Sequence, residues 1–289
     1  MSQTVAVHCP AKVNLALSIG SPGPDGMHPL ASWMVALNFG DHLALTVADA
    51  PSSHFDIAFA DDAPRPGEVD WPLEKDLAYR AHRAMEPFVN RPLPMQATIR
   101  KRIPAGAGLG GGSANAAGML VALCRLYDLS IDEPALTRLA ATLGSDVAFA
   151  AGALLGRPSA LVTGLGETLE DAPLREPLHL VLILPPFGCP TGPVYRAFDD
   201  RTTVPVCADA DRVRALTRMS PLPQDAPFND LAAPACDIRP ELGDLLTTLH
   251  EKLALPVHVI APSALTAKVL ARKVAAETGL TAVATRTMG

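Results

Sequence analysis

This chain of 289 residues has few aromatic side chains, no excess of basic residues and no long apolar run. No apolar run reaches the roughly 18 residues that a membrane-spanning helix needs. The N-terminal segment lacks a basic start followed by a sustained apolar core, so it does not resemble a signal peptide. The formal net charge of −6 argues against a nucleic-acid-binding protein, which would usually carry a basic face. We therefore expect a cytoplasmic protein that binds neither a membrane nor nucleic acid.

Cysteine is present, but not in a pattern that builds a site. The five cysteines are odd in number and scattered, and no C-x-x-C motif occurs. We therefore expect neither a disulfide framework nor a zinc site, because free thiols in a reducing compartment fit this pattern better. The cysteines are Cys9, Cys124, Cys189, Cys207 and Cys236.

Aliphatic residues must build the core, because 48 % of the residues are hydrophobic and only 4 % are aromatic. The length fits one large domain or two ordinary ones. Strand patterns followed by helix patterns extend to about residue 158, and a second set of strand and helix patterns begins there. We therefore expect an α+β protein with two halves that meet near residue 158.

The first half is expected to begin with extended segments and to end with helices. A strand over 4–20 is expected to break near Pro10, and strands over 30–49 are expected to turn at Gly40–Asp41. A short strand followed by a polar loop is expected over 54–72, and a further strand over 94–104. Helices are expected over 74–89, 113–129 and 132–144, with a helix or turn over 145–156.

The second half shows a hairpin pattern followed by alternating helices and strands. The hairpin is expected over 159–173, strands over 178–186, 256–260 and 281–287, and helices over 209–219, 239–254 and 265–279.

The most unusual segment is glycine-rich: five of the seven residues from Gly106 to Gly112 are glycine. A flexible linker does not fit, because the segment lies between an expected strand and an apolar helix. A simple turn needs only one or two glycines. An anion-binding loop explains all five, because glycine lets backbone N–H groups approach a phosphate and the following helix adds its own free N–H groups.

Two well-known phosphate-binding motifs do not account for this loop. Gly106, Gly108 and Gly111 match the G-x-G-x-x-G fingerprint of dinucleotide-binding proteins, but that motif requires a second strand ending in an acidic residue. The corresponding span here is helical, so an NAD-binding enzyme is disfavoured. No Gly-Lys-Ser/Thr follows the glycines, so the loop is not a Walker A motif either.

The segment "PAGAGLGGGSANAA" resembles the phosphate-binding loop of the GHMP kinase superfamily, which includes galacto-, homoserine, mevalonate and phosphomevalonate kinases. Four further segments narrow the resemblance to a branch that phosphorylates the 2-hydroxyl of the cytidine diphosphate ester of methylerythritol in non-mevalonate isoprenoid synthesis. They are "CPAKVNLAL" at 9–17, "DGMHPLASWM" at 25–34, "TLGSDVAFAAGALLG" at 142–156 and "FNDLAAPA" at 228–235.

The resemblance implies a two-domain GHMP kinase fold, and an enzyme that uses ATP and Mg²⁺. Residues 1–158 would form the N-terminal ATP-binding domain, ribosomal-protein-S5-like in fold, and residues 159–289 a ferredoxin-like C-terminal domain. The partner would be the small-molecule substrate, and the protein would be a monomer or a homodimer. Two alternatives stay open: another small-molecule GHMP kinase, and a catalytically impaired relative that binds nucleotide.

The resemblance assigns catalysis to Lys12 and Asp146. Asp146 would act as the acid–base group, and Lys12 would position the hydroxyl and balance transferring charge. From the residues alone, Asp146 could instead cap a helix after Gly144-Ser145, and Lys12 could point to solvent from an edge strand.

The remaining site residues are also implied by the resemblance. His28, Asn14 and Tyr195 would contact the substrate, although His28 could be a solvated turn residue and Tyr195 a core residue. Ser113 could reach a phosphate or Mg²⁺, or could cap its helix. The residues expected to bind ATP are Pro104, Gly106, Gly108, Leu109, Gly110, Gly111, Gly112, Ser113 and Ala114.

Two segments depart from the pattern of this branch. Met27 stands where a tyrosine usually precedes the histidine, and a thioether cannot stack on cytosine as a ring does. Residues 261–264 read Ala-Pro-Ser-Ala where a glycine-serine-glycine loop is usual. The Ala-Pro-Ser-Ala segment has a proline and no glycine, so it cannot bring backbone N–H groups as close to a substrate phosphate as the glycine-serine-glycine loop does.

Overall fold

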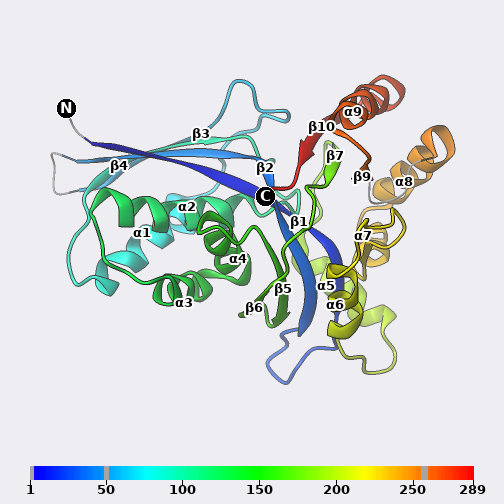
Figure 1. Cartoon of the computed structure of the whole chain (residues 1–289), viewed down its shortest axis with the longest axis horizontal. Helices are drawn as coiled ribbons and strands as arrows, with labels where there is room; N and C mark the ends of the chain where they lie inside the picture. The colour runs from blue at the N-terminus through cyan, green and yellow to red at the C-terminus, as the bar shows by residue number, and fades with distance from the viewer. Residues whose placement is uncertain (1–2, 49–51, 255–259) are drawn as a thin grey trace. The chain divides into compact units, whose positions relative to one another are not determined.

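The computed structural model describes residues 3–48, 52–254 and 260–289, and the chain divides into two compact units (Figure 1). The first unit contains Met1–Lys12, Ala36–Ala105 and Leu109–Pro158. The second contains Val13–Val35, Gly106–Gly108 and Ser159–Gly289. Two long strands, β1 (Thr4–Ile19) and β2 (Leu30–Val47), contribute residues to both units. The assignment of functional domains to 1–158 and 159–289 stays a prediction.

In the described part of the first unit, helices lie against one side of a sheet (Figure 1). Strands β3 (His54–Phe59) and β4 (Met95–Lys101) join β2 and β1 in the order β3-β4-β2-β1. Strand β3 is parallel to β4, and β4 is antiparallel to β2. The helical segments are η1 (Leu73–Lys75), α1 (Leu77–Phe88), α2 (Gly111–Leu126), α3 (Glu133–Leu143) and α4 (Ser145–Leu154).

Strands β1 and β2 correct two expectations, because neither is interrupted. Strand β1 runs through Pro10, whose fixed φ suits extended chain wherever the sheet needs no N–H. Strand β2 runs through Gly40 and Asp41, which do not form a turn. A Cβ atom at Gly40 would lie 2.3 Å from the carbonyl oxygen of Cys9. The glycine is therefore needed for close approach of two backbones.

The second unit holds a hairpin, a short parallel strand and a separate sheet. Strands β5 (Ser159–Gly164) and β6 (Thr168–Asp171) form the hairpin, which pairs with the first half of β2 in antiparallel register from Leu30–Gly164 to Val35–Ser159. Strand β8 (Phe228–Asn229) runs parallel to β1. The separate antiparallel sheet has the order β10 (Thr281–Arg286), β7 (His179–Leu184), β9 (Ile260–Ala261).

The described residues of the second unit also form helices (Figure 1). They are α5 (Thr191–Arg201), α6 (Ala210–Thr217), α7 (Ala232–Ile238), α8 (Pro240–Leu253) and α9 (Ala264–Thr278). Helix α9 packs on β10 and β7 through Ala267 and Ala271, whose small side chains allow a close approach. Helices α5 and α7 were not expected from the sequence.

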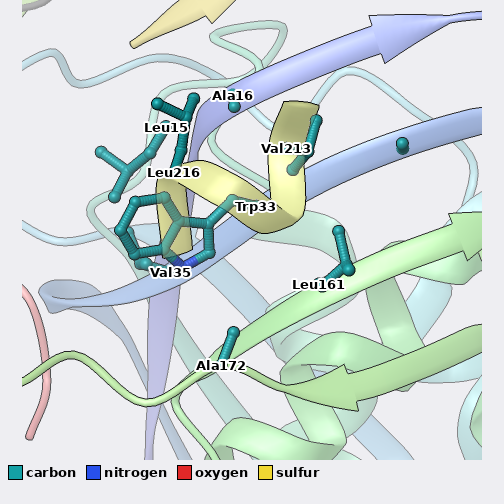
Figure 2. Packing of buried hydrophobic residues seen from close by; sticks show 9 residues of the cluster. Leu15, Ala16, Trp33, Val35, Leu161, Ala172, Val213 and Leu216 are labelled. Carbon is teal, nitrogen blue, oxygen red and sulfur yellow. The ribbon is translucent and has the colours of Figure 1, made fainter. Parts of the chain in front are cut away.

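The core of the second unit is built around the indole of Trp33 (Figure 2). Val213 and Leu216 of α6 pack against the cluster that also holds Leu15 and Leu161. The Trp33 Nε1–H donates to the hydroxyl of Ser159 at 3.0 Å, so the buried ring carries no unpaired donor. This core holds the part of β1 that carries Asn14 and the part of β2 that follows His28.

The other expected helices and strands are present within the described residues. Helix α2 begins at Gly111, two residues before the expected start. The strand expected over 256–260 lies almost wholly outside the described residues, which resume at Ile260. None of the described helices combines the length and the apolar character required to cross a membrane.

Candidate active site

The glycine segment forms a left-handed loop that leads directly into α2. Gly106, Gly108 and Gly110 have φ angles of +70°, +71° and +70°, which side chains other than glycine adopt only with strain. A Cβ atom at Gly108 would meet nothing within 4 Å, so that position faces open space. Gly110 is the residue before the helix, and it offers no side chain to cap the first N–H groups of α2. The loop and the N-terminus of α2 thus offer backbone N–H donors and the positive end of the helix dipole to an anion.

Lys12 of β1 is held against this loop. Its backbone N–H donates to the carbonyl oxygen of Leu109 at 2.9 Å. A Cβ atom at Gly110 would lie only 3.0 Å from the Lys12 Cγ atom. Gly110 is therefore glycine both for its positive φ and because the lysine stem occupies the adjacent space.

The Lys12 ammonium points to Asp146, with 3.4 Å between Nζ and Oδ2. The side chain of Lys12 is only 13 % exposed, so the alternative of a solvent-facing lysine is wrong. Asp146 is 32 % exposed and is the second residue of α4, where the positive end of the helix favours a carboxylate. The capping position belongs to Gly144, so Asp146 is not the N-cap.

The remaining residues of the loop divide into packing and accessible positions. Pro104, Leu109 and Ala114 are buried, whereas Gly106 and Gly112 are exposed. Gly111 lies against Ile103, where a Cβ atom would come within 2.9 Å of the side chain. Ser113 is half-buried in the first turn of α2. No side chain caps this helix, so the capping alternative for Ser113 is wrong.

A buried polar network anchors both ends of the loop, and sequence reasoning missed it. The Asp41 carboxylate accepts from the backbone N–H groups of Arg102 and Ile103 at 2.6 and 2.8 Å. It also accepts from Lys101 Nζ at 2.8 Å and from Asn115 Nδ2 at 2.9 Å. Lys101 Nζ donates in addition to Asn115 Oδ1 at 2.8 Å. The network therefore ties the end of β4 to the first turns of α2.

Only part of this network had a signal in the sequence. Asp41 was taken as a turn residue after Gly40, although its carboxylate is fully buried. Asn115 lies inside the small-residue stretch that follows the glycines, and Lys101 lies at the end of β4. Lys101 continues the inward-facing alternation of Met95, Ala97 and Ile99, which was the one cue that it has a buried partner.

His28 in the second unit is a structured residue rather than a solvated one. Its side chain is 9 % exposed, and its Nε2 atom lies 2.7 Å from Asp199 Oδ1. Its ring lies 4.9 Å from the Tyr195 ring and 6.2 Å from the Phe198 ring, measured between centroids. Helix α5 thus supplies all three partners. Because α5 was not expected, Asp199 was missed.

Asn14 and Gly106 each make a fixed contact within the second unit. Asn14 Nδ2 donates to the hydroxyl of Ser32 at 2.6 Å, which in turn donates to the carbonyl oxygen of Ala16 at 2.9 Å. Gly106 lies against Gly188, where a Cβ atom would come within 3.3 Å of the Gly106 carbonyl oxygen. Both contacts limit how far these residues can move.

The two departures from the family pattern have different structural outcomes. Met27 is 53 % exposed, and its backbone N–H donates to Asp25 Oδ1 at 3.0 Å. Ser263 is the N-cap of α9, where its hydroxyl accepts from the Thr266 N–H at 3.2 Å. The altered segment 261–264 therefore starts a helix with a side-chain cap instead of offering a glycine loop.

Comparison with known proteins agrees with this geometry. The sequence model of the GHMP kinases N terminal domain matches residues 76–154. A 4-diphosphocytidyl-2-C-methyl-D-erythritol kinase of Caulobacter vibrioides (strain NA1000 / CB15N) is 35 % identical over 253 residues, covering 85 % of this chain and 82 % of the relative. The corresponding kinase of Paenarthrobacter aurescens (strain TC1) is 34 % identical, covering 85 % of this chain and 78 % of the relative.

Solved structures extend the similarity to nearly the full length. A crystal structure of 4-(cytidine 5'-diphospho)-2C-methyl-D-erythritol kinase superposes with a TM-score of 0.75 at 30 % identity, covering 99 % of this chain and 100 % of that one. A homoserine kinase from Cytophaga hutchinsonii superposes with a TM-score of 0.70 at 15 % identity, covering 100 % of this chain and 95 % of that one. The second likeness shows the fold alone.

The fold and the glycine loop define a GHMP kinase, an ATP-dependent enzyme that phosphorylates a small molecule. The GHMP kinase fold expected from the sequence is thereby confirmed. Within this class, the chain belongs to the 4-diphosphocytidyl-2-C-methyl-D-erythritol kinase family.

Proposed function

We propose that this chain transfers the terminal phosphoryl group of ATP to the 2-hydroxyl of 4-diphosphocytidyl-2-C-methyl-D-erythritol. The observation that carries the proposal is the Lys12–Asp146 pair, which lies against the Gly110 turn at the start of α2. A phosphate cradle, a cation and a proton acceptor are the three requirements of phosphoryl transfer to an alcohol.

The phosphate loop would hold ATP through its backbone. The turns at Gly106, Gly108 and Gly110 direct N–H groups toward the phosphates, and the N-terminus of α2 favours their charge. The buried residues of the loop keep its shape, and the Asp41 network fixes both of its ends. The proposed ATP-binding residues are Pro104, Gly106, Gly108, Leu109, Gly110, Gly111, Gly112, Ser113 and Ala114.

The donor set fits Mg²⁺ bound together with nucleotide. Mg²⁺ prefers oxygen ligands and is usually held by one or two protein groups plus substrate phosphates and water. The half-buried hydroxyl of Ser113, in the first turn of α2, is such a group. When Mg²⁺ is bound, it neutralises negative charge on the phosphates.

Asp146 orients the attacking hydroxyl and accepts its proton. Lys12, at 3.4 Å, keeps the carboxylate in place and offers positive charge where negative charge develops. Because Lys12 is mostly buried, its charge is less screened by water than that of a surface lysine.

His28 and its neighbours supply a cytosine-binding surface. When His28 donates its Nε2 hydrogen to Asp199, its Nδ1 atom is left as an acceptor. The exocyclic amine of cytosine is a matching donor. Tyr195 lies beside the His28 ring and offers an aromatic face for the base, and Asn14, which donates to the Ser32 hydroxyl, would contact the substrate.

Three further properties belong to this proposal. Residues 1–158 would bind ATP and residues 159–289 would complete the enzyme as the C-terminal domain. The enzyme would be a monomer or a homodimer and would act in the cytoplasm, where ATP is supplied. Its partner would be its small-molecule substrate.

A coupled assay of ADP formation tests the substrate assignment. The panel holds the cytidine diphosphate ester, free methylerythritol phosphate, homoserine and mevalonate, each with ATP and Mg²⁺. The proposal expects kcat/KM to be far higher for the cytidine diphosphate ester than for the other three alcohols. Equal use of an alcohol without the base would refute the cytosine surface, and turnover of none of them with intact ATP binding would favour a binding-only relative.

A further inference from the structure

We propose that Cys189 and Cys236 form a reversible disulfide that lowers ATP use by pulling the loop before α5 away from Gly106. The existence of the disulfide does not depend on the proposed function, whereas its effect on ATP rests on the phosphate loop described above. Both thiols belong to the second unit and are partly accessible to solvent.

The two cysteines are brought together by the loop after β7 and by helix α7. The Sγ atom of Cys189 lies 3.9 Å from the carbonyl oxygen of Ala235. That oxygen and the Cα atom of Cys236 belong to the same planar peptide unit, so the Cys189 sulfur lies beside the Cys236 backbone. A disulfide would bring the two Cα atoms to about 4.4–6.8 Å from each other.

The surroundings of Cys236 leave room for its thiol to turn toward Cys189. Gly243 of α8 faces it, and a Cβ atom at Gly243 would lie 3.8 Å from the Cys236 Cβ and 3.9 Å from its sulfur. Because glycine places no side chain there, the thiol can change rotamer at little cost.

The loop that carries Cys189 also contacts the phosphate loop. A Cβ atom on Gly188, the preceding residue, would lie 3.3 Å from the Gly106 carbonyl oxygen. Arg239 Nε donates to the Gly188 carbonyl oxygen at 3.0 Å, which holds the loop in this position. A sulfur–sulfur bond of about 2.0 Å requires Cys189 to leave the Ala235 carbonyl and move toward Cys236. Gly188 would then move with it and lose its contact with Gly106.

Hydrogen peroxide is a sufficient oxidant for this step. One thiolate attacks a peroxide oxygen, the O–O bond breaks, and a sulfenic acid forms with release of water once the leaving oxygen is protonated. The second thiol attacks that sulfur, the S–O bond breaks, and a second water leaves. Two thiol hydrogens and two electrons thus pass to one peroxide, and a dithiol such as dithiothreitol reverses the reaction by exchange.

The environment of the two thiols determines the pH range in which the disulfide forms quickly. Burial, followed by the charge of the neighbouring Cys189 thiol, raises the pKa of Cys236. Burial likewise raises the pKa of Cys189. Because the thiolate is the reactive form, the disulfide should form slowly at neutral pH and faster as the pH rises.

Peptide mapping of the full-length protein after peroxide treatment tests the proposal. We expect a linked peptide that contains Cys189 and Cys236, forms faster at higher pH, and disappears with dithiothreitol. The Cys207→Ser variant, which removes an exposed thiol elsewhere, should link equally well. The Cys189→Ser and Cys236→Ser variants should not link and should keep their activity after peroxide.

The functional part is measured on the same samples. Oxidation should lower kcat/KM for ATP by roughly tenfold or more, since a small displacement of a binding loop has effects of that size. Absence of the linked peptide, or a linked protein with unchanged ATP use, would overturn the proposal. If the reduced protein proves inactive as a kinase, ATP affinity is compared instead, and an equal affinity in both states would also overturn it.

Discussion

The ammonium group of Lys12 lies 3.4 Å from the carboxylate of Asp146, with the lysine stem packed beside the Gly110 turn. Asp146→Asn should lower kcat by about 10²–10⁴-fold while leaving ATP affinity intact, because it removes the proton acceptor but keeps the shape. Lys12→Ala should show a similar loss. The double variant should lose less than the product of the two losses, because the groups act as a unit.

Asp132→Asn is the matched control for that comparison. Asp132 is also an acidic residue at a helix N-terminus, where its side chain accepts from the Ala135 N–H at 2.7 Å. Asparagine caps a helix as well as aspartate does, so this variant should keep full activity. Activity of Asp146→Asn within about threefold of the parent enzyme would remove Asp146 from the mechanism, since positioned acid–base groups contribute far more.

The Gly110 turn should tolerate no side chain. Gly110→Ala adds backbone strain of about 1–2 kcal/mol. It also places a Cβ atom 3.0 Å from the Lys12 stem. We expect a loss of both stability and kcat, measured by thermal unfolding and by the coupled assay.

Gly156→Ala separates strain from contact. Gly156 also has a positive φ, +95°, but a Cβ atom there would meet nothing within 4 Å. This variant should lose stability and keep its activity. If both glycine variants retain kcat, Lys12 does not depend on the turn in the way described.

The Asp41 network predicts a large stability effect from one buried carboxylate. Asp41→Asn leaves the Lys101 ammonium buried without its counter-ion, which costs about 3–5 kcal/mol in comparable cases. Asp56→Asn breaks a second ion pair to β4, with Arg100, but on the exposed side of the sheet. That control should change the free energy of unfolding by at most about 1 kcal/mol. Equal effects of the two variants in urea unfolding would contradict the role given to the network.

The His28–Asp199 contact predicts discrimination between bases. A uridine analogue of the substrate presents an acceptor where cytosine presents its amine donor, so it would face the Nδ1 acceptor of His28. The uridine analogue should lose about 1–3 kcal/mol of binding, the usual value of a good base contact. Asp199→Asn should shrink this preference, because the histidine tautomer is then no longer fixed. Unchanged preference in that variant, measured as the ratio of kcat/KM values, would argue for another cytosine ligand.

Strong local patterns in the sequence predicted most of the helices and strands. The glycine loop and helix α2 follow from composition and apolar character, and the hairpin 159–171 follows from alternation around Gly164 and Gly166. The strand breaks expected at Pro10 and Gly40 were wrong, because sheet pairing overrides the usual role of these residues as strand breakers.

The candidate site was less predictable, because its supporting contacts join residues far apart in the chain. The spacing of Lys12 and Asp146 carries no signal of their contact, and only the family resemblance paired them. Asp199 was missed because Gly192 and Pro193 near the start of α5 argued against a helix, although Val194, Ala197 and Phe198 form a short apolar stripe. Asp41 was missed because a buried carboxylate can be inferred only when its donors are known.

Identification of the reaction product tests the central claim most directly. The protein is incubated with ATP, Mg²⁺ and 4-diphosphocytidyl-2-C-methyl-D-erythritol, and the product is examined by mass spectrometry and by phosphorus and carbon NMR. We predict a single new phosphomonoester on the 2-hydroxyl, formed at similar rates by the parent enzyme and by Asp132→Asn and about 10²–10⁴-fold more slowly by Asp146→Asn. Phosphate on another hydroxyl, or no phosphorylated product from a protein that still binds ATP, would contradict the proposed function.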